Sequence, residues 1–571
     1  MMPEPREYPG IGVGSTAAVG PCARFAAPPA APADEPVPSG AEAIAAAGAA
    51  LAEALEQVSA ELRAAAAEHP GETLGDVLSA TAEMADDPAL ADRAARIIAE
   101  GNGPANAMTK AVAEFAATLT GIGGYLAERV TDLNSVRDRT VARLLGPATP
   151  GLRTIDEPAV VIAHELTPAD TSSLDMTKVI ALVTEVGGPT SHTAIIARQL
   201  GLPCVVRAAG ATQIPEGALV AVDGARGSVV VAPDEATREA IVRRMERHRA
   251  LATDTAPGAT SDGHPIQLLA NIGGVADARS AAGKAVEGVG LFRTEFVFLD
   301  AAAEPGVAEQ AGIYREVLKA FTGRKVVVRT LDAGADKPLA YANPAHESNP
   351  ALGQRAYRLV RSVPHLMEHQ LRALAAAIDD CPDTEAWVMA PMISTAGEAA
   401  DFRRRADEAG LGARARIGVM VEVPAVALCA DQVLQHVDFV SIGTNDLAQY
   451  TMAADRELGA LSDLIDRWQP AVLRLVEATA RAGAASGTPV GVCGESASDP
   501  LMALVLCGLG ITSLSMSTPA VPAVRFALRH TSLATCRAMA RAAIDAPDAA
   551  AAVSAVQELL DPRVREAMSL D

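Results

Sequence analysis

"RIGVMVEVPAVALCADQVLQHVDFVSIGTND" (residues 416–446) contains two short apolar strands, RIGVMVE and VDFVSIG, separated by a helical stretch. The same strand-then-helix unit recurs from residue 262 onward. The other predicted strands are PIQLLAN, GVGLFR, KVVVRT, AWVMAP, PVGVCG and TSLSMS. Eight strands that alternate with helices are typical of a (β/α)8, or TIM, barrel, and we expect residues 256–571 to form one.

Charged and polar residues stand where these predicted strands end. They are Asn271, Arg293, Arg329, Glu422, Asn445, Asp446 and Cys493. In such a barrel the carboxyl ends of the strands meet at one mouth, where active sites lie. Strand-end Arg and Asp side chains also form structural ion pairs, so any one of them alone has two interpretations. Their recurrence on successive strands favours an active site.

Two of these residues, Glu422 and Asp446, are carboxylates with no His or Cys ligand motif nearby. Oxygen ligands suit a hard cation that keeps part of its water shell, so we expect Mg²⁺. The neighbouring arginines suit phosphate and carboxylate groups, which they bind bidentately. A lone Cys in an apolar strand is more often a core residue, but Cys493 stands at the strand end. The set predicts a pocket for a small phosphorylated acid.

The front of the chain has a different pattern. Residues 41–145 are rich in Ala and hold sixteen acidic and eight basic side chains. Apolar residues recur there at helical spacing, and the breaks HPGET and GNGPAN separate at least three or four helices. We therefore expect an acidic helical bundle over residues 31–145. Strand-like segments on either side predict an α/β domain, residues 1–30 and 146–234, into which the bundle is inserted.

One histidine, His192, stands in the segment GGPTSHTAIIARQLG. This segment predicts a helix that begins near Thr190 or Ser191 as N-cap and ends at Gly201. The histidine then lies in the first turn, where the helix dipole favours a neutral imidazole and free N–H groups favour a phosphate bound to it. The residues alone also fit a surface histidine or a cap, which is the commoner case.

Composition limits the classes of function. The 571 residues carry 48 basic and 70 acidic side chains, a net charge of −22, which argues against a nucleic acid or an anionic membrane as the main partner. We find no apolar run of membrane-spanning length and no signal peptide, so we expect a cytoplasmic protein. The seven scattered cysteines include no CxxC motif and indicate neither disulfides nor zinc.

Several blocks of this sequence resemble one family, enzyme I of the bacterial sugar phosphotransferase system, a phosphoenolpyruvate–protein phosphotransferase. The resemblance covers nearly the whole chain. The blocks are GGPTSHTAIIAR (187–198), GVGLFRTEFVF (288–298), VVVRTLDAGADK (326–337), NPALGQRAYR (349–358), GVMVEVPA (418–425), SIGTNDLAQYTMAADR (441–456) and GVCGE (491–495). Together they are highly specific.

The resemblance implies a role for each matched residue. His192 would be phosphorylated on Nε2, and Cys493 would protonate the enolate as pyruvate forms. Glu422 and Asp446 would bind Mg²⁺. Phosphoenolpyruvate would be bound by Arg293, Arg329, Arg355, Lys337, Asn445, Asp446 and Arg456. The implied mechanism is ping-pong, with the phosphoryl group passing from His192 to a histidine of a second protein, HPr.

The same resemblance implies partners and motions. The helical insertion resembles the family's HPr-binding region, clearest in AEMADDPALADRAARIIAEG and YLAERVTDLNSV, and its acidity fits a partner with basic residues. Residues 235–255 would be a helical linker about which the front half swings between HPr and the barrel. Enzymes of the family dimerise through the barrel, so we expect a homodimer.

Three alternatives were weighed against this assignment. Pyruvate phosphate dikinase and phosphoenolpyruvate synthase share the histidine block and the barrel, but they need an ATP-binding domain, and GIGVGS is not a GxGxxG loop. A scaffold protein that only signals its phosphorylation state would not need the arginines, carboxylates and thiol kept here. A nitrogen-regulatory paralogue would carry an additional sensor domain before the GIGVGSTAAVG strand. The departures VEVP and ADDP from the usual pattern touch no proposed chemical residue.

Overall fold

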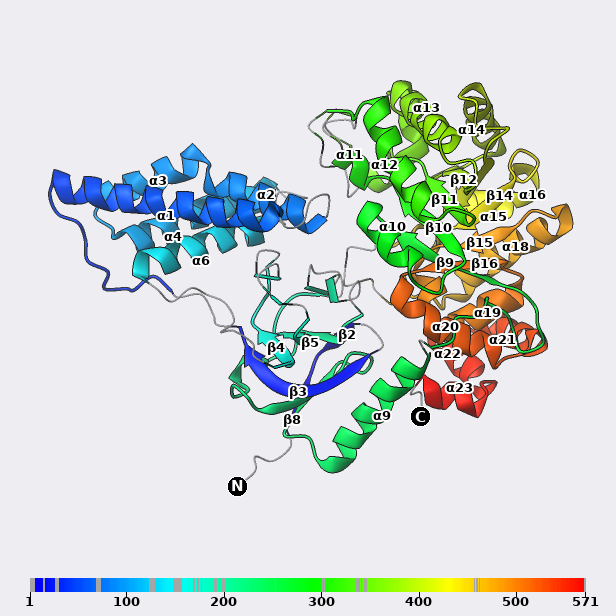
Figure 1. Cartoon of the computed structure of the whole chain (residues 1–571), viewed down its shortest axis with the longest axis horizontal. Coiled ribbons are helices and arrows are strands. Elements are labelled where there is room, and N and C mark those ends of the chain that lie inside the picture. The colour runs from blue at the N-terminus through cyan, green and yellow to red at the C-terminus, as the bar shows by residue number, and fades with distance from the viewer. Residues whose placement is uncertain are drawn as a thin grey trace. The chain divides into compact units, whose positions relative to one another are not determined.

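The computed structural model describes the chain except for residues 1–5, 14–15, 26–29, 68–72, 123–128, 147–156, 168–169, 172–173, 176, 189–192, 195, 198–200, 252, 300, 302, 335–338, 340, 343–346, 456–457, 459–460, 462 and 569–571. Two compact units make up the chain, Met1–Arg247 and His248–Asp571. Figure 1 labels their elements.

The first unit contains an eight-stranded sheet with strand order β1-β8-β7-β3-β4-β5-β6-β2. Its strands are β1 (Arg6–Pro9), β2 (Ile11–Val13), β3 (Ala17–Arg24), β4 (Ala159–Ala163), β5 (Val179–Thr184), β6 (Cys204–Val206), β7 (Leu219–Asp223) and β8 (Ser228–Val231). Strands β3, β4, β5 and β6 run parallel, and the outer pairs are antiparallel. Because β4 is buried along its whole length, its run AVVIA has no polar face.

A bundle of helices is inserted between β3 and β4, as the sequence predicted. The helices are α1 (Ala41–Ala67), α2 (Thr73–Ala85), α3 (Pro88–Ala99), α4 (Pro104–Ile122) and α6 (Val130–Leu145). Their apolar faces form one core, with Val58, Ile98 and Val112 fully buried. Arg139 of α6 bridges Glu61 of α1, at 2.7 Å, and Asp170, at 3.0 Å. The expected charged helix after β8 is α9, Glu235–Leu251.

The second unit is built on a closed barrel of eight parallel strands, so the predicted (β/α)8 fold is confirmed. In chain order they are β9 (Gln267–Ile272), β10 (Gly288–Arg293), β11 (Lys325–Arg329), β12 (Glu385–Ala390), β13 (Arg416–Val421), β14 (Phe439–Ile442), β15 (Val490–Val492) and β16 (Ser513–Met516). Strand β9 pairs with β16 and closes the barrel. All eight coincide with the apolar segments found in the sequence.

Helices surround the barrel (Figure 1). They are α10 (Val275–Ala282), α11 (Phe296–Leu299), α12 (Val307–Ala320), α13 (Pro364–Asp379), α14 (Ala396–Glu408), α15 (Pro424–Leu428), α16 (Ala430–Val433), α17 (Thr444–Met452), α18 (Pro470–Ser486), α19 (Pro500–Leu509), α20 (Val521–Arg529), α21 (Leu533–Asp545), α22 (Ala549–Glu558) and α23 (Pro562–Ala567). Helix α19 illustrates their ends, because Asp499 caps its first turn and Gly510, at φ 97°, terminates it.

Side chains alternate between the two faces of each strand. Along β11, Val326 and Val328 pack with the surrounding helices, whereas Val327 faces the barrel interior. Arg329 shares the parity of Val327 and so ends the strand on the interior side. The interior layer consists of Leu291, Val327, Trp387, Met389, Met420, Phe439 and Cys493. In the part of the chain that the structure describes, every helix is too short or too polar to cross a bilayer.

Candidate active site at the carboxyl end of the barrel

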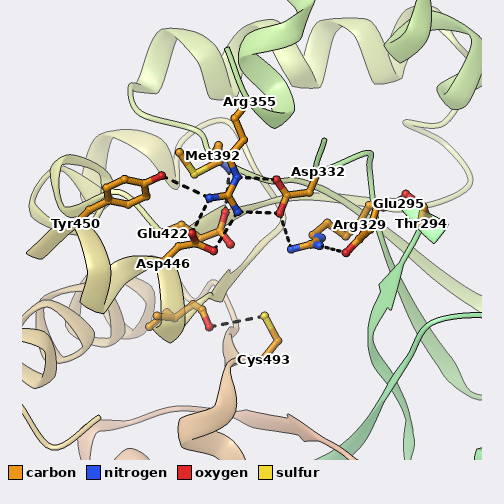
Figure 2. Close-up of polar contacts among 11 residues, drawn as sticks. Thr294, Glu295, Arg329, Asp332, Arg355, Met392, Glu422, Asp446, Tyr450 and Cys493 are labelled. Carbon is orange, nitrogen blue, oxygen red and sulfur yellow. Dashed lines mark hydrogen bonds and ion pairs between the residues drawn. The ribbon is translucent and has the colours of Figure 1, made fainter. Parts of the chain in front are cut away.

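The strand-end residues meet at the carboxyl end of the barrel (Figure 2). Arg329 is the last residue of β11, and Glu422 follows β13. Asp446 lies in the first turn of α17, and Cys493 follows β15. These residues come from different strands but share one end of the barrel because all eight strands are parallel.

Arg329 is held by two carboxylates. Its Nη2 donates to Oε1 of Glu295 at 2.6 Å, and its Nη1 lies 3.0 Å from Oδ2 of Asp332. All three side chains are buried. Burial alone would lower the pKa of Arg329, but the negative charges of Glu295 and Asp332 outweigh it and raise that pKa. The guanidinium therefore stays charged inside the protein.

Arg355 pairs with two carboxylates, those of Asp332 and Asp446, as Figure 2 shows. Its Nε and Nη2 donate to Asp332, at 3.0 and 3.1 Å. Its Nη1 and Nη2 donate to Oδ1 and Oδ2 of Asp446, at 2.7 and 3.2 Å. The hydroxyl of Tyr450 lies 3.4 Å from Nη1. Asp332 is thus shared by both arginines. Through its two ion pairs, Arg355 links the segment after β11 to helix α17.

Unusual backbone conformations bring Arg355 to this place. Gly334 has φ 115°, and a Cβ there would lie 3.0 Å from the Cα of Arg355. Ala356 has φ 53° and donates its backbone N–H to the carbonyl of Ala333 at 2.9 Å. A left-handed alanine costs about 1 kcal/mol or more, and such strain is found where a site requires a fixed geometry.

Glu422 is fully enclosed. Its Oε2 accepts the backbone N–H of Met392 at 2.9 Å, and Met392 is another non-glycine residue with positive φ, at 58°. A Cβ on Gly443 would lie 2.6 Å from Oε1 of Glu422, so only glycine leaves room for this carboxylate. Burial first, and then the charges of Asp446 and Asp332, raise the pKa of Glu422 to about 8. The site therefore has a shortage of positive charge around this carboxylate.

Cys493 faces the barrel interior beneath these charges. Its Sγ lies 3.7 Å from the carbonyl oxygen of Ile442, and its own carbonyl accepts from Nδ2 of Asn271 at 3.2 Å. Burial raises the pKa of the Cys493 thiol to about 11, and the nearby charge of Glu422 adds to that rise. At neutral pH this group is a thiol, which is a proton donor and a poor nucleophile.

Two other predicted substrate residues are described. Arg293 ends β10, opposite Arg329 of β11, and its positive charge opposes the rise in the pKa of the Cys493 thiol. Asn445, in α17, accepts the backbone N–H of Glu495 at 3.2 Å through Oδ1. The remaining predicted site residues, His192, Lys337 and Arg456, lie outside the described residues.

The end of the predicted histidine helix is described even though its beginning is not. Gly201 has φ 69°, and the N–H of Leu202 donates to the carbonyl of Ala197 at 2.9 Å. This bond spans five residues and is the one that closes a helix at a left-handed glycine. The bond is of the kind expected at a helix that ends at Gly201.

Sequence reasoning missed three members of the cluster, Glu295, Asp332 and Tyr450. All three lie inside the quoted blocks, in FRTEF, RTLDAG and AQY, within four residues of a predicted site residue. The sequence signal that could have identified Glu295 and Asp332 is a carboxylate two or three residues after a strand-end arginine. Tyr450 stands four residues after Asp446, one helical turn away, so helical spacing alone placed it on the same face.

The carboxylates were tested as a divalent-cation site. Within the described ranges no group of three or more His, Cys, Asp or Glu side chains is arranged to hold a metal ion. Mg²⁺, however, usually takes one or two protein carboxylates and completes its octahedron with phosphate oxygens and waters. Glu422 and Asp446 supply that number, and both carboxylates are buried with their charges acting on each other, a setting that a divalent cation would neutralise. The donor set fits Mg²⁺.

Comparison with known proteins agrees with this geometry. Residues 247–533 match the PEP-binding domain of PEP-utilising enzymes, residues 155–227 their mobile domain and residues 9–129 their N-terminal domain. A phosphoenolpyruvate-protein phosphotransferase from Streptomyces coelicolor is 51% identical over 509 residues, which cover 89% of this chain and 91% of that protein. The chain belongs to the phosphoenolpyruvate-protein phosphotransferase family.

More distant members of the family agree. A phosphoenolpyruvate-protein phosphotransferase from Haloferax volcanii is 41% identical over 84% of this chain and 86% of its own length. A multiphosphoryl transfer protein from Xanthomonas campestris is 39% identical over 82% of this chain and 57% of its own length. The sequence-based assignment to the enzyme I family is confirmed. The whole described cluster, from Glu295 to Cys493, lies within the match to the PEP-binding domain.

Proposed function

We propose that this protein transfers the phosphoryl group of phosphoenolpyruvate to His192 and then to a histidine of HPr, releasing pyruvate. The observation that carries this proposal is the buried set of two arginines, four carboxylates and a protonated thiol at the carboxyl end of the barrel. A small dianionic acid that loses phosphate and gains a proton needs these groups.

The arginines bind the substrate. Arg293 and Arg329 stand at the ends of neighbouring strands, and their guanidinium groups match the oxygens of a phosphate or carboxylate. Asn445 and the N-terminus of α17 supply uncharged donors to the same end. Arg355, Lys337 and Arg456 complete the substrate site. Glu422 and Asp446 hold Mg²⁺, which when bound neutralises charge on the phosphoryl oxygens.

The thiol of Cys493 completes the reaction. As His192 Nε2 forms its bond to phosphorus, the bond from phosphorus to the enol oxygen breaks, and the enolate of pyruvate remains in the barrel. The Cys493 Sγ–H then gives its proton to the methylene carbon. A thiol whose pKa is raised to about 11 keeps this proton at neutral pH until the carbanion character develops.

The other domains deliver the histidine and select the partner. Residues 1–30 and 146–234 carry His192, the segment 235–255 is the linker, and residues 31–145 bind HPr in the cytoplasm. Charge supports the last assignment, since residues 41–145 carry sixteen acidic and eight basic side chains. Because the histidine must meet both HPr and the barrel, the front half swings about the linker.

The barrel also forms a homodimer. Supporting this, four leucines in the segments after β11, β13 and β14 are unusually exposed in the described chain. They are Leu352 at 66%, Leu428 at 70%, Leu458 at 51% and Leu464 at 36%. Large apolar side chains exposed in these connections are suited to burial against a partner subunit. Sedimentation of Leu428→Glu tests the dimer, which should dissociate at a higher concentration than wild type.

Labelled phosphate tests the proposed reaction. The protein is incubated with Mg²⁺ and phosphoenolpyruvate labelled in its phosphate, HPr is then added, and ATP labelled in its γ-phosphate serves as a parallel donor. Acid-labile label on the wild type that moves to HPr is expected. His192→Ala should take no label, whereas His164→Ala, a matched change at an exposed histidine after β4, should be labelled normally. Label from ATP alone would assign the protein to the dikinase class, and no label would contradict the proposal.

A further inference from the structure

Arg355 engages both oxygens of the Asp446 carboxylate. The two contacts, 2.7 Å to Oδ1 and 3.2 Å to Oδ2, form a bidentate pair in which both side chains are buried. Asp446 is also one of the two carboxylates that fit a divalent cation. A cation bound at this carboxylate would lie within a few ångströms of the guanidinium, and two positive charges that close repel strongly in a buried site.

Asp332 gives Arg355 a second anchor. The carboxylate of Asp332 accepts from Nε and Nη2 of Arg355, at 3.0 and 3.1 Å, and it also pairs with Arg329 at 3.0 Å. Arg355 can therefore release Asp446 and remain paired. That change frees one hydrogen of Nη1 and one hydrogen of Nη2, which now face Asp446. Nη1 also donates to the hydroxyl of Tyr450 at 3.4 Å.

We propose that Arg355 and the divalent cation compete for Asp446, and that cation binding turns the freed donors of Arg355 toward the substrate while Asp332 holds the arginine in place. This inference rests on the proposed use of a divalent cation, and it makes Arg355 the positioning residue that couples metal binding to substrate binding. The metal and phosphoenolpyruvate would then bind with positive cooperativity.

The charge balance of the cluster agrees with this exchange. The cluster holds four carboxylates and two guanidinium groups. Arg329 pairs with Glu295 and Asp332, and Arg355 pairs with Asp332 and Asp446. The fourth carboxylate, Glu422, accepts the backbone N–H of Met392 at 2.9 Å. A divalent cation between Glu422 and Asp446 therefore gains from both carboxylates, and the displaced guanidinium keeps Asp332.

Metal affinity without substrate tests the competition. Mn²⁺ binding to the full-length protein is measured by electron paramagnetic resonance in the absence of phosphoenolpyruvate. Arg355→Gln should bind Mn²⁺ about tenfold more tightly than wild type, because the competing cation is gone. Arg358→Gln is the matched control, since Arg358 contacts the carbonyls of Leu352 and Gly353 and the hydroxyl of Ser394 but no carboxylate of the described residues. Its Mn²⁺ affinity should change less than about threefold.

Two further measurements distinguish competition for Asp446 from an effect of misfolding in Arg355→Gln. Arg355→Lys keeps the charge but not the bidentate geometry and should lie between wild type and Arg355→Gln. In the wild type, the side-chain Nε–H resonance of Arg355, assigned from its loss in Arg355→Lys, should shift as Mg²⁺ is added. Equal or weaker Mn²⁺ binding by Arg355→Gln, or an Arg355 resonance unchanged at saturating Mg²⁺, would overturn the inference. Labelling of His192 is scored separately, so failure of the proposed function and failure of the competition give different results.

Discussion

Buried cationic side chains at the two ends of the barrel have pKa values shifted in opposite directions. At the carboxyl end, Arg329 and Arg355 are each paired with carboxylates, which raise the pKa of both arginines although burial would lower it. At the amino end, Lys325 lies 3.6 Å from the ring centroid of Trp387 and 3.4 Å from Oε1 of Gln267. Burial lowers the pKa of Lys325 to about 8.

These opposite pKa shifts distinguish the carboxyl end, where charged groups can bind a ligand, from the amino end, where side chains only pack. A cavity at the amino end, lined by Lys325, Trp387 and Ser441 among others, has a volume of about 20 Å³, which is room for a water molecule but not for a substrate. Its cation is packed against an aromatic ring, and burial outweighs the opposite charge of Glu385 on the neighbouring strand. At the carboxyl end the charges are close, mixed in sign and accompanied by strained backbone at Ala356 and Met392. Strain and surplus charge mark the functional end.

Of the substitutions at the two ends of the barrel, Cys493→Ser should cause the largest loss of activity. A hydroxyl is a far weaker acid than a thiol, so pyruvate formation should slow by about 10²- to 10⁴-fold. Isotope-labelled phosphoenolpyruvate, followed by the rate of pyruvate release under steady turnover, measures this. Cys429→Ser, at an exposed thiol outside the barrel interior, is the control and should turn over normally. Normal pyruvate release by Cys493→Ser would remove the thiol from the mechanism.

A smaller loss is expected from Asp332→Asn, which removes the charge shared by Arg329 and Arg355. Both guanidinium groups should then take several orientations, and KM for phosphoenolpyruvate should rise about 10- to 100-fold. Steady-state kinetics of the variant gives this value. At the amino end, Glu385→Gln changes a carboxylate that accepts from Nε1 of Trp387 at 2.9 Å, and its KM should equal that of wild type. Equal KM values for both variants would show that Asp332 does not position the arginines.

The smallest effect, and one on stability alone, is expected from Lys325→Met. The unfolded chain binds this proton up to pH 10.5 and the folded chain only up to about pH 8, so the folded state bears the cost of a buried charge below pH 8. That cost is about 3 kcal/mol. The variant should therefore be more stable than wild type at pH 7, and this difference should shrink by about 3 kcal/mol as the pH rises toward 10.5.

Tryptophan fluorescence during urea unfolding measures this stability change, because both tryptophans, Trp387 and Trp468, belong to the barrel unit. Lys319→Met provides the control, since Lys319 is exposed and lies 3.7 Å from Glu316. A pH-independent difference between Lys325→Met and wild type would contradict the buried-charge interpretation of the amino end.

The sequence was sufficient for the barrel but not for the cluster at its mouth. Apolar runs of strand length, separated by helical stretches, located all eight strands, because burial on both faces leaves a clear pattern. The partners of Arg355 left no such pattern. They are 23 and 91 residues away in the chain, and they meet it only because Gly334 and Ala356 adopt left-handed conformations. A turn that depends on tertiary packing cannot be derived from local propensity.

We propose that the carboxyl end of the barrel performs phosphoryl transfer and that the amino end only supports the fold. Acid-labile label at His192 after incubation with Mg²⁺ and phosphate-labelled phosphoenolpyruvate, compared between Asp446→Asn and Lys325→Met, tests this difference most directly. Asp446→Asn should take up no detectable label, while Lys325→Met should be labelled as fast as wild type. Normal labelling of Asp446→Asn, or loss of label in a folded Lys325→Met, would contradict this proposal.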